Sequence, residues 1–125
     1  MANEKVLLEF FGKIENDVNG VIAAAVVDLE SGMTLAAKTN RGDFDLAAAS
    51  AYNSELVKQK MKIMRTLNLK SSLEDMLITL GKQYHVIRPV TAKAGIFIYL
   101  VLDRSKANLA MARRACQEAE AGLAF

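Results

Sequence analysis

The chain has 125 residues, of which 52% are hydrophobic and only one is proline, a composition that suits a compact domain and excludes a disordered chain. Its 16 basic and 14 acidic residues leave a formal charge of +2, too little to neutralise a run of phosphates, so we expect no nucleic-acid partner. We expect no membrane span, since no apolar run is long enough, and a single cysteine is typical of a reducing compartment such as the cytoplasm.

The first third of the chain predicts a helix followed by a β-hairpin. Apolar residues recur at helical spacing over residues 6–14, and Asn19-Gly20 ends that helix. The uninterrupted apolar run Val21–Val27, with β-branched residues at its ends, indicates a strand covered on both faces. Gly32 can supply the positive φ of a turn, and Met33–Ala37 returns as the second strand.

The longest predicted helix lies in the middle of the chain. Asp43 is a suitable N-cap, and the helical pattern runs from Phe44 to Leu67 before Asn68–Ser72 interrupts it. The basic residues of this helix gather in its C-terminal half, where they complement the negative end of the helix dipole.

Three strands and a helix complete the order. The strands are expected at Asp75–Leu80, Gln83–Arg88 and Ile96–Leu102, and the first two are joined by a Gly81-Lys82 turn. Ser105 is expected to cap the last helix. The apolar arc of that helix comprises Leu109, Ala112, Cys116, Ala119 and Leu123, and outside the arc lie Arg113, Arg114, Gln117, Glu118 and Glu120.

These elements predict an α+β fold in the order α-β-β-α-β-β-β-α. Two hairpins and one crossover helix favour a five-stranded antiparallel sheet with three helices packed on its two faces. Since the sequence contains no internal repeat or linker, we expect a single domain over residues 1–125.

The residue types that carry catalysis are scarce. His85, the only histidine, lies within a predicted strand, and Cys116, the only cysteine, lies on the apolar face of the last helix. Neither belongs to a pattern typical of nucleophilic catalysis, and together they cannot form a closed metal site. Gly81-Lys82 lacks the upstream glycine and the following Ser or Thr of a phosphate-binding loop. We therefore expect no enzyme activity, no metal and no cofactor.

The middle helix carries two apolar stripes. One stripe consists of Ala49, Tyr52, Leu56, Ile63 and Leu67, and the other of Leu46, Val57, Met61 and Met64. Together they span about half of the helix circumference, more than the roughly 100° that packing on one sheet requires. Either the helix lies deep in its own fold, or one stripe meets a second chain. Methionines suit adaptable contact surfaces, which favours the second chain.

The strand Asp75–Leu80 favours the same conclusion. If the hairpins leave this strand at the edge of the sheet, only Asp75 guards it against pairing with another chain. A two-fold dimer could pair the strand with its copy and lay the two long helices across the joined sheet. This arrangement would bury the second stripe.

Several stretches of the chain, taken together at their spacings, carry a family resemblance. They are Gly20–Asp28, Glu30–Met33 with Leu35-Ala36, Leu77-Ile78 through Gln83–Pro89, and Phe97–Arg104 followed by Asn108–Arg113. In this conjunction they resemble the Roadblock family of dynein-light-chain-related proteins, in its stand-alone prokaryotic form. The match covers nearly the whole chain.

The resemblance implies the Roadblock, profilin-like fold and a homodimer built through the long helix and the edge strand. The dimer face that it implies consists of Leu46, Val57, Lys60, Met61, Met64, Met76 and Ile78. It also implies a function by binding, because family members regulate or scaffold small Ras-like GTPases, or serve motor and signalling complexes. Lys58, Lys62 and Arg65 are candidates for binding an acidic partner, or they form a solvated face whose charges suit the helix dipole.

Two alternatives stay open. If the chain activates a partner GTPase, it would order the partner's switch loops or supply a loop arginine, Arg41 or Arg104. The rival function is a small-molecule-sensing domain with a pocket between sheet and helix, which would need polar groups aimed inward. The central strands offer small and aliphatic side chains instead, so the sequence favours the binding module.

Overall fold

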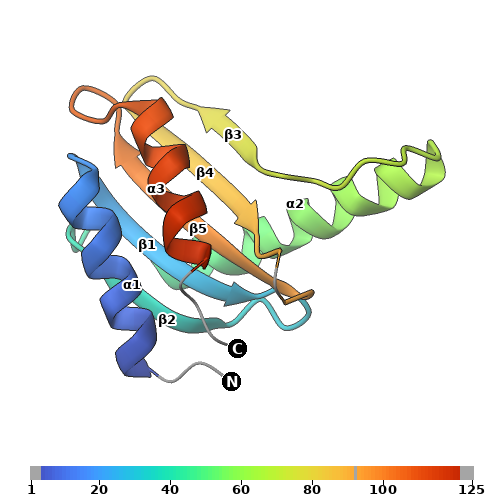
Figure 1. Cartoon of the computed structure of the whole chain (residues 1–125), viewed down its shortest axis with the longest axis horizontal. Coiled ribbons are helices and arrows are strands. Elements are labelled where there is room, and N and C mark those ends of the chain that lie inside the picture. Colours follow the sequence, from blue (N-terminus) through green and yellow to red (C-terminus); the bar gives the residue numbers. More distant parts are fainter. Residues whose placement is uncertain (1–3, 92, 122–125) are drawn as a thin grey trace.

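A computed structural model describes residues 4–91 and 93–121 of the chain (Figure 1). It contains α1 (Glu4–Asp17), β1 (Val21–Asp28), β2 (Thr34–Thr39), α2 (Leu46–Thr66), β3 (Met76–Thr79), β4 (Gln83–Pro89), β5 (Ile96–Asp103) and α3 (Leu109–Ala121). The strands form one antiparallel sheet in the order β2-β1-β5-β4-β3. The predicted element order and the α+β fold class are confirmed.

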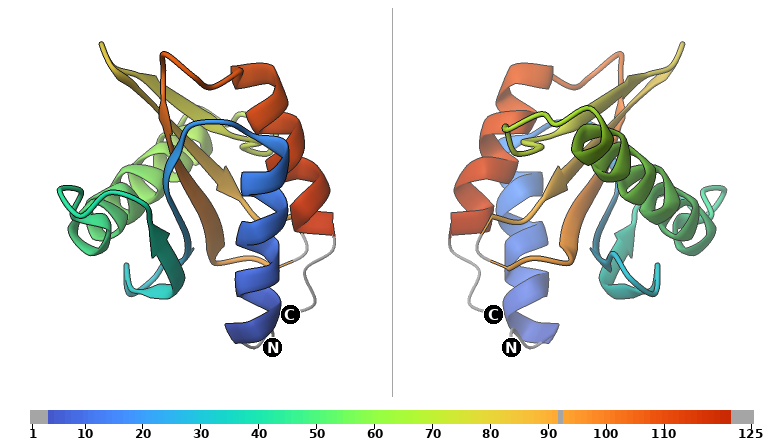
Figure 2. Two further views of the ribbon diagram at one scale, coloured as in Figure 1. Left: turned by 90° about the vertical axis from the view of Figure 1, so that its left-hand side faces the viewer. Right: turned by 90° about the vertical axis from the view of Figure 1, so that its right-hand side faces the viewer.

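The sheet separates two helical layers. α1 and α3 pack against each other on one face, and α2 alone lies on the other (Figure 2). β1 and β5 occupy the centre of the sheet, whereas β2 and β3 form its edges. The edge position of β3, on which the expected strand pairing depends, is confirmed.

The two central strands are buried on both faces, as the apolar run of β1 predicts. Side chains alternate along each strand, so Ala24 and Val26 face α1 and α3, whereas Ala25 faces α2. From β5, Phe97 and Tyr99 join the core beneath α2. Small alanines in β1 let α2 approach closely, while each large side chain that is buried contributes about 1.5–3 kcal/mol of stability.

Two helices begin later than predicted. α2 starts at Leu46, and the carboxylate of Asp45, not of Asp43, accepts the capping hydrogen bond from the third residue of the helix at 3.0 Å. α3 is capped by Asn108, whose side chain accepts at 3.0 Å, and not by Ser105. Several residues that can cap a helix precede each of these two helices. The ones farther from the helix, Asp43 and Ser105, form side-chain hydrogen bonds within the preceding turn instead.

Gly32 turns the chain from β1 into β2 with a φ of +76°, the conformation predicted for it. A Cβ at this position would lie 3.2 Å from the Cα of Ala51 in α2. Glycine is therefore required both for the backbone of the turn and for the close approach of the turn to α2.

A buried ion pair connects the C-terminal end of α3 to β4. The Nε of Arg88 donates to Glu120 at 2.6 Å, with side-chain exposures of 11% and 6%, and the Thr91 amide donates to the other carboxylate oxygen. Burial raises the pKa of the Glu120 carboxyl, but these donors outweigh burial and hold the pKa below its ordinary value. The expectation that Glu120 lies outside the packed face of α3 is therefore wrong.

The apolar arc of α3 is otherwise observed as expected within the described residues. Ala112, Cys116 and Ala119 are buried, Leu109 is partly buried against them, and Leu123 lies outside the described residues. Burial raises the pKa of the Cys116 thiol to about 12, so this cysteine stays protonated and inert.

Candidate interaction face

Helix α2 forms one side of the molecule and is only half supported by the sheet. It packs over β1 and β2, and its C-terminal half projects past the sheet (Figure 1). Its buried residues are Leu46, Ser50, Ser54 and Val57. All four lie within the first 12 of the 21 residues of the helix, so the part of α2 after Val57 contains no fully buried residue.

A stripe of large apolar side chains runs along the exposed side of α2. Tyr52 is 78% exposed, Leu56 and Ile63 are each 39% exposed, and Leu67, just after the helix, is 63% exposed. Their spacing places them on one side of the helix. We call these four residues the outer stripe. Contiguous exposed apolar residues on a helix are typical of a surface that meets another protein.

The outer stripe is not the one expected to form the dimer face. Leu46 and Val57 are 5% and 0% exposed and pack in the chain's own core beneath α2, so assigning them to a dimer face is wrong. Met61 and Met64 are half-buried, and Lys60 is exposed. The prediction for Lys60, Met61 and Met64 stays untested, whereas Leu46 and Val57 were misplaced because helical spacing shows that two apolar faces exist but not which one meets the sheet.

Two buried serines interrupt the apolar pattern on the side of α2 that faces the sheet. Ser50 and Ser54 are buried and lie on the face that carries Leu46 and Val57. The Ser54 hydroxyl donates to the Ser50 carbonyl oxygen at 2.9 Å, which satisfies that polar group without leaving the helix. These small side chains permit close packing against the β1–β2 turn, whereas a hydrophobicity pattern predicts that they are exposed.

Strand β3 carries the other part of the expected interface. Met76 and Ile78 are half-buried and pack on the α2 side of the sheet, whereas Leu77 and Leu80 are exposed. Within the described residues, β3 pairs with β4 alone. Its outer edge is free to accept another strand.

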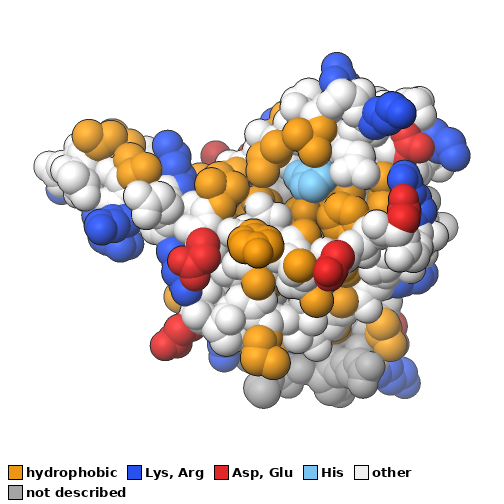
Figure 3. Space-filling model, turned by 180° about the vertical axis from the view of Figure 1, so that it is seen from behind, with side chains coloured by type: hydrophobic (Ala, Val, Ile, Leu, Met, Phe, Trp, Pro, Cys, Tyr) orange, Lys and Arg blue, Asp and Glu red, His pale blue; other side chains and the backbone are white. Residues whose placement is uncertain are grey.

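Between α2 and β3 lies a surface centred on His85, which α2 leaves partly uncovered. Figure 3 shows the histidine in pale blue with hydrophobic side chains gathered around it. The neighbouring half-buried residues are Phe44, Ala49, Met76 and Ile78. We call these five residues the His85 surface; it adjoins the outer stripe through Ala49.

A chain of hydrogen bonds runs beneath the His85 surface. The His85 Nε2 lies 2.9 Å from Oε1 of Gln83, and its Nδ1 lies 2.8 Å from the Tyr99 hydroxyl, which also bonds to the Asn53 side chain. Burial lowers the pKa of His85, and burial raises the pKa of Tyr99 to about 12. Both groups are therefore neutral near pH 7.

Three basic residues of α2, Lys58, Lys62 and Arg65, lie away from the outer stripe, whereas Lys60, three residues before Ile63, borders it. Lys58 donates to the Glu30 carbonyl oxygen at 2.9 Å and to Glu55 at 3.3 Å. Its ammonium group is therefore already hydrogen-bonded within the chain. Lys62 and Arg65 are exposed. These two remain candidates for contact with an acidic partner.

A groove of about 600 Å³ lies between the projecting half of α2 and the end of the sheet. Its lining includes Val57, Met61, Met64, Ile96 and Phe97. It is of ligand size, and its lining also includes the polar or charged residues Arg65, Ser71, Ser72, Glu74, Arg88 and Thr91, so the sensing function stays a candidate.

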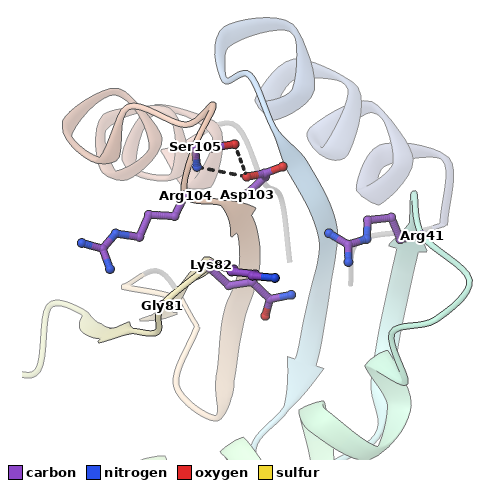
Figure 4. Close-up of a pocket in the computed structure, with 7 residues that line it drawn as sticks. Arg41, Gly81, Lys82, Asp103, Arg104 and Ser105 are labelled. Carbon is purple, nitrogen blue, oxygen red and sulfur yellow. Dashed lines mark hydrogen bonds between the residues drawn. The ribbon is translucent and has the colours of Figure 1, made fainter.

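Arg41 and Arg104, far apart in the sequence, line a second hollow of about 640 Å³. In Figure 4, however, the Arg41 guanidinium points toward the space between the labelled residues, whereas the Arg104 guanidinium points away from Arg41. Arg104 donates to the Leu80 carbonyl oxygen at 2.9 Å, and Arg41 pairs with Asp43 at 3.3 Å. Each arginine already has a partner in this chain, which weighs against a poised catalytic arginine.

The described part of the chain lacks two other kinds of site. Residues 4–91 and 93–121 contain no group of three or more His, Cys, Asp or Glu side chains placed to hold a metal ion. No helix in those ranges is long and apolar enough to cross a membrane.

Solved structures with the same architecture exist. The chain is similar to a Roadblock/LC7 domain from Streptomyces avermitilis, with a TM-score of 0.74, 13% identity and 88% of each chain covered. It is also similar to the gliding protein MglB from Thermus thermophilus, with a TM-score of 0.81 and 13% identity over 95% of this chain and 86% of that chain. A structure of MglB with a tetrameric arrangement has a TM-score of 0.80 and 13% identity, over 93% and 83% of the two chains.

No protein-family model matches the sequence, and no curated protein matches it. At these identities the structural likeness establishes the fold, and the chain has the Roadblock/LC7 fold that its sequence resembles.

Proposed function

We propose that the chain is a non-catalytic, homodimeric Roadblock-type regulator or scaffold that binds a small Ras-like GTPase. The observation that carries the proposal is the outer stripe of α2, whose four side chains stay 39–78% exposed in the described part of the chain. A projecting, half-supported helix with exposed Tyr52, Ile63 and Leu67 gains stability by burying those side chains against a second protein.

In the proposed dimer, β3 pairs with its copy, and each α2 crosses onto the partner's sheet. The free edge of β3 and the His85 surface on the α2 side of the sheet (Figure 3) support this arrangement, because a second chain would cover both. The MglB structure with a tetrameric arrangement supports self-association in this fold. A lone, buried Cys116 suits a reducing compartment, so we place the protein in the cytoplasm.

A GTPase partner follows from the Roadblock resemblance of the sequence. The partner would hold its own nucleotide and metal, so the regulator need only shift the population of switch-loop conformations. Since both loop arginines are engaged within the chain, we favour this route over an arginine supplied in trans.

Titration of purified Ras-like GTPases from the same genome tests the partner. Each GTPase is loaded with GDP or with a non-hydrolysable GTP analogue. We expect one of them to bind at least about 10-fold more tightly in the GTP form, a difference of about 1.4 kcal/mol. Lys62→Glu with Arg65→Glu tests the basic residues, and Lys70→Glu, at an exposed loop position, is the control. If no GTPase binds in either form, the proposal is wrong. If the GDP and GTP forms bind equally well, the chain acts as a scaffold and not as a regulator.

The groove beside α2 supports a second candidate, a sensor of apolar small molecules. Native mass spectrometry of the chain purified from its host would detect a bound compound. A stoichiometric small molecule that is lost in a Met61→Trp variant, designed to fill the groove, would favour the sensor.

A further inference from the structure

The His85 surface contains one polar network in apolar surroundings. The ring of His85 lies 5.6 Å from that of Tyr99 and 6.0 Å from that of Phe44, measured between centroids. Beside it are the half-buried Met76 and Ile78 of β3. In the proposed dimer this is where the partner's α2 would lie.

The hydrogen bonds of His85 select the neutral ring. Oε1 of Gln83 can only accept, so Nε2 carries the proton that it donates over 2.9 Å. Nδ1 is then free to accept the Tyr99 O–H over 2.8 Å. A second proton on the ring would reverse the bond to Tyr99, whose hydroxyl would have to turn and accept from Nδ1, and would place a charge among apolar groups.

No charged group compensates such a positive charge. Burial is the sole cause of the lowered pKa of His85, and the only titratable group among its bonding and ring partners is Tyr99. The surrounding elements also carry charges: Asp45 and Lys60 at α2, Asp75 before β3, Arg88 on β4 and Asp103 on β5. None of these contributes to the pKa of the ring.

We propose that His85 makes self-association depend on pH, so that two chains join over this surface when the ring is neutral and separate when it is protonated. This inference rests on the proposed dimer. Covering the ring with a second chain removes more water from it and disfavours the charged form further. The dimer therefore binds fewer protons than two free chains, and acid drives dissociation.

A pH dependence of dimerisation that is caused by His85 can be separated from the titration of other side chains. His85 is the only histidine, and burial raises the pKa of the only cysteine to about 12. Between about pH 5.5 and 7.5 no other side-chain type ordinarily titrates. Each unit by which dimerisation lowers the pKa of the ring weakens the dimer about 10-fold per ring at low pH.

Sedimentation equilibrium at pH 7.5, 6.5 and 5.5 measures the linkage. Because burial already lowers the pKa of the ring in the free chain, we expect the dissociation constant of the wild type to rise at least about 3-fold from pH 7.5 to 5.5. In His85→Asn the side-chain oxygen can still accept the Tyr99 hydroxyl but cannot titrate, so its dimer should be insensitive to pH over this range. A thermal midpoint for each variant shows whether it is folded.

The outcomes separate this inference from the proposed dimer. A wild type that dimerises equally at all three pH values, or a His85→Asn dimer that retains the full pH dependence, overturns the inference and leaves the dimer standing. A wild type that is monomeric at every pH overturns both. If His85→Asn does not fold, NMR titration of the wild-type ring decides: a lower pKa in concentrated than in dilute protein is expected, and equal values overturn the inference.

Discussion

Removing the carboxylate of Glu120 should destabilise the fold strongly, because it leaves a guanidinium buried without its partner. The Arg88 and Glu120 side chains are 11% and 6% exposed and lie 2.6 Å apart, and the Thr91 amide also loses its acceptor. Breaking a buried pair on one side costs about 3–5 kcal/mol. Because Arg88 keeps some contact with water, we expect about 3 kcal/mol for Glu120→Ala, a fall of about 12 °C in the unfolding midpoint of a chain this size.

Thermal and urea unfolding of three variants tests this reasoning at pH 7. Glu120→Gln keeps an oxygen for the Thr91 amide and should cost less than Glu120→Ala. Arg88→Met with Glu120→Leu removes both charges and should be more stable than Glu120→Ala alone. A double variant no more stable than Glu120→Ala would refute the account.

The ion pair between Arg88 and Glu120 also makes the stability of the fold depend on pH. Because the folded pKa of Glu120 lies below the ordinary 4.5, its contribution is present above pH 4.5 and is lost as the pH falls through the folded value. The difference between wild type and Glu120→Ala should therefore shrink in strong acid.

Three further predictions concern single positions. Gly32→Ala should cost about 1–3 kcal/mol, since it forces a side chain into positive φ, whereas Gly12→Ala in α1, with open space around it, should be neutral or stabilising in the same urea titration. The Cys116 thiol should resist a thiol reagent in the native protein and react at once in guanidinium, because burial raises its pKa to about 12. Val57→Asp should abolish the cooperative unfolding transition, whereas Ile63→Asp should leave it intact, since Val57 is 0% and Ile63 is 39% exposed.

The sequence predicted the order of elements and the edge strand well, because those depend on local signals. The β1 run is uninterrupted and the helices are strongly periodic, so burial on two faces and helix formation follow directly. Gly32 likewise adopts the positive φ expected of it.

The buried side of α2 was harder to predict, because the sequence contains two apolar faces and only tertiary packing decides which of them meets the sheet. Ser50 and Ser54 have polar side chains but lie on the buried face, and the large Tyr52 lies on the exposed one. Glu120 was misplaced for a related reason: its partner Arg88 is distant in the sequence. In each case the deciding contact is tertiary, and a helical pattern does not contain it.

The central claim is that the outer stripe of α2 joins two chains, and sedimentation equilibrium near pH 7.5 at tens of micromolar tests it most directly. The wild type should sediment at twice the chain mass of 13.7 kDa. Tyr52→Glu with Ile63→Glu should give a folded monomer. The matched pair Leu8→Glu with Met111→Glu, at exposed apolar positions in the other helical layer, should stay dimeric. A monomeric wild type, or a dimer that survives the outer-stripe substitutions, would contradict the claim.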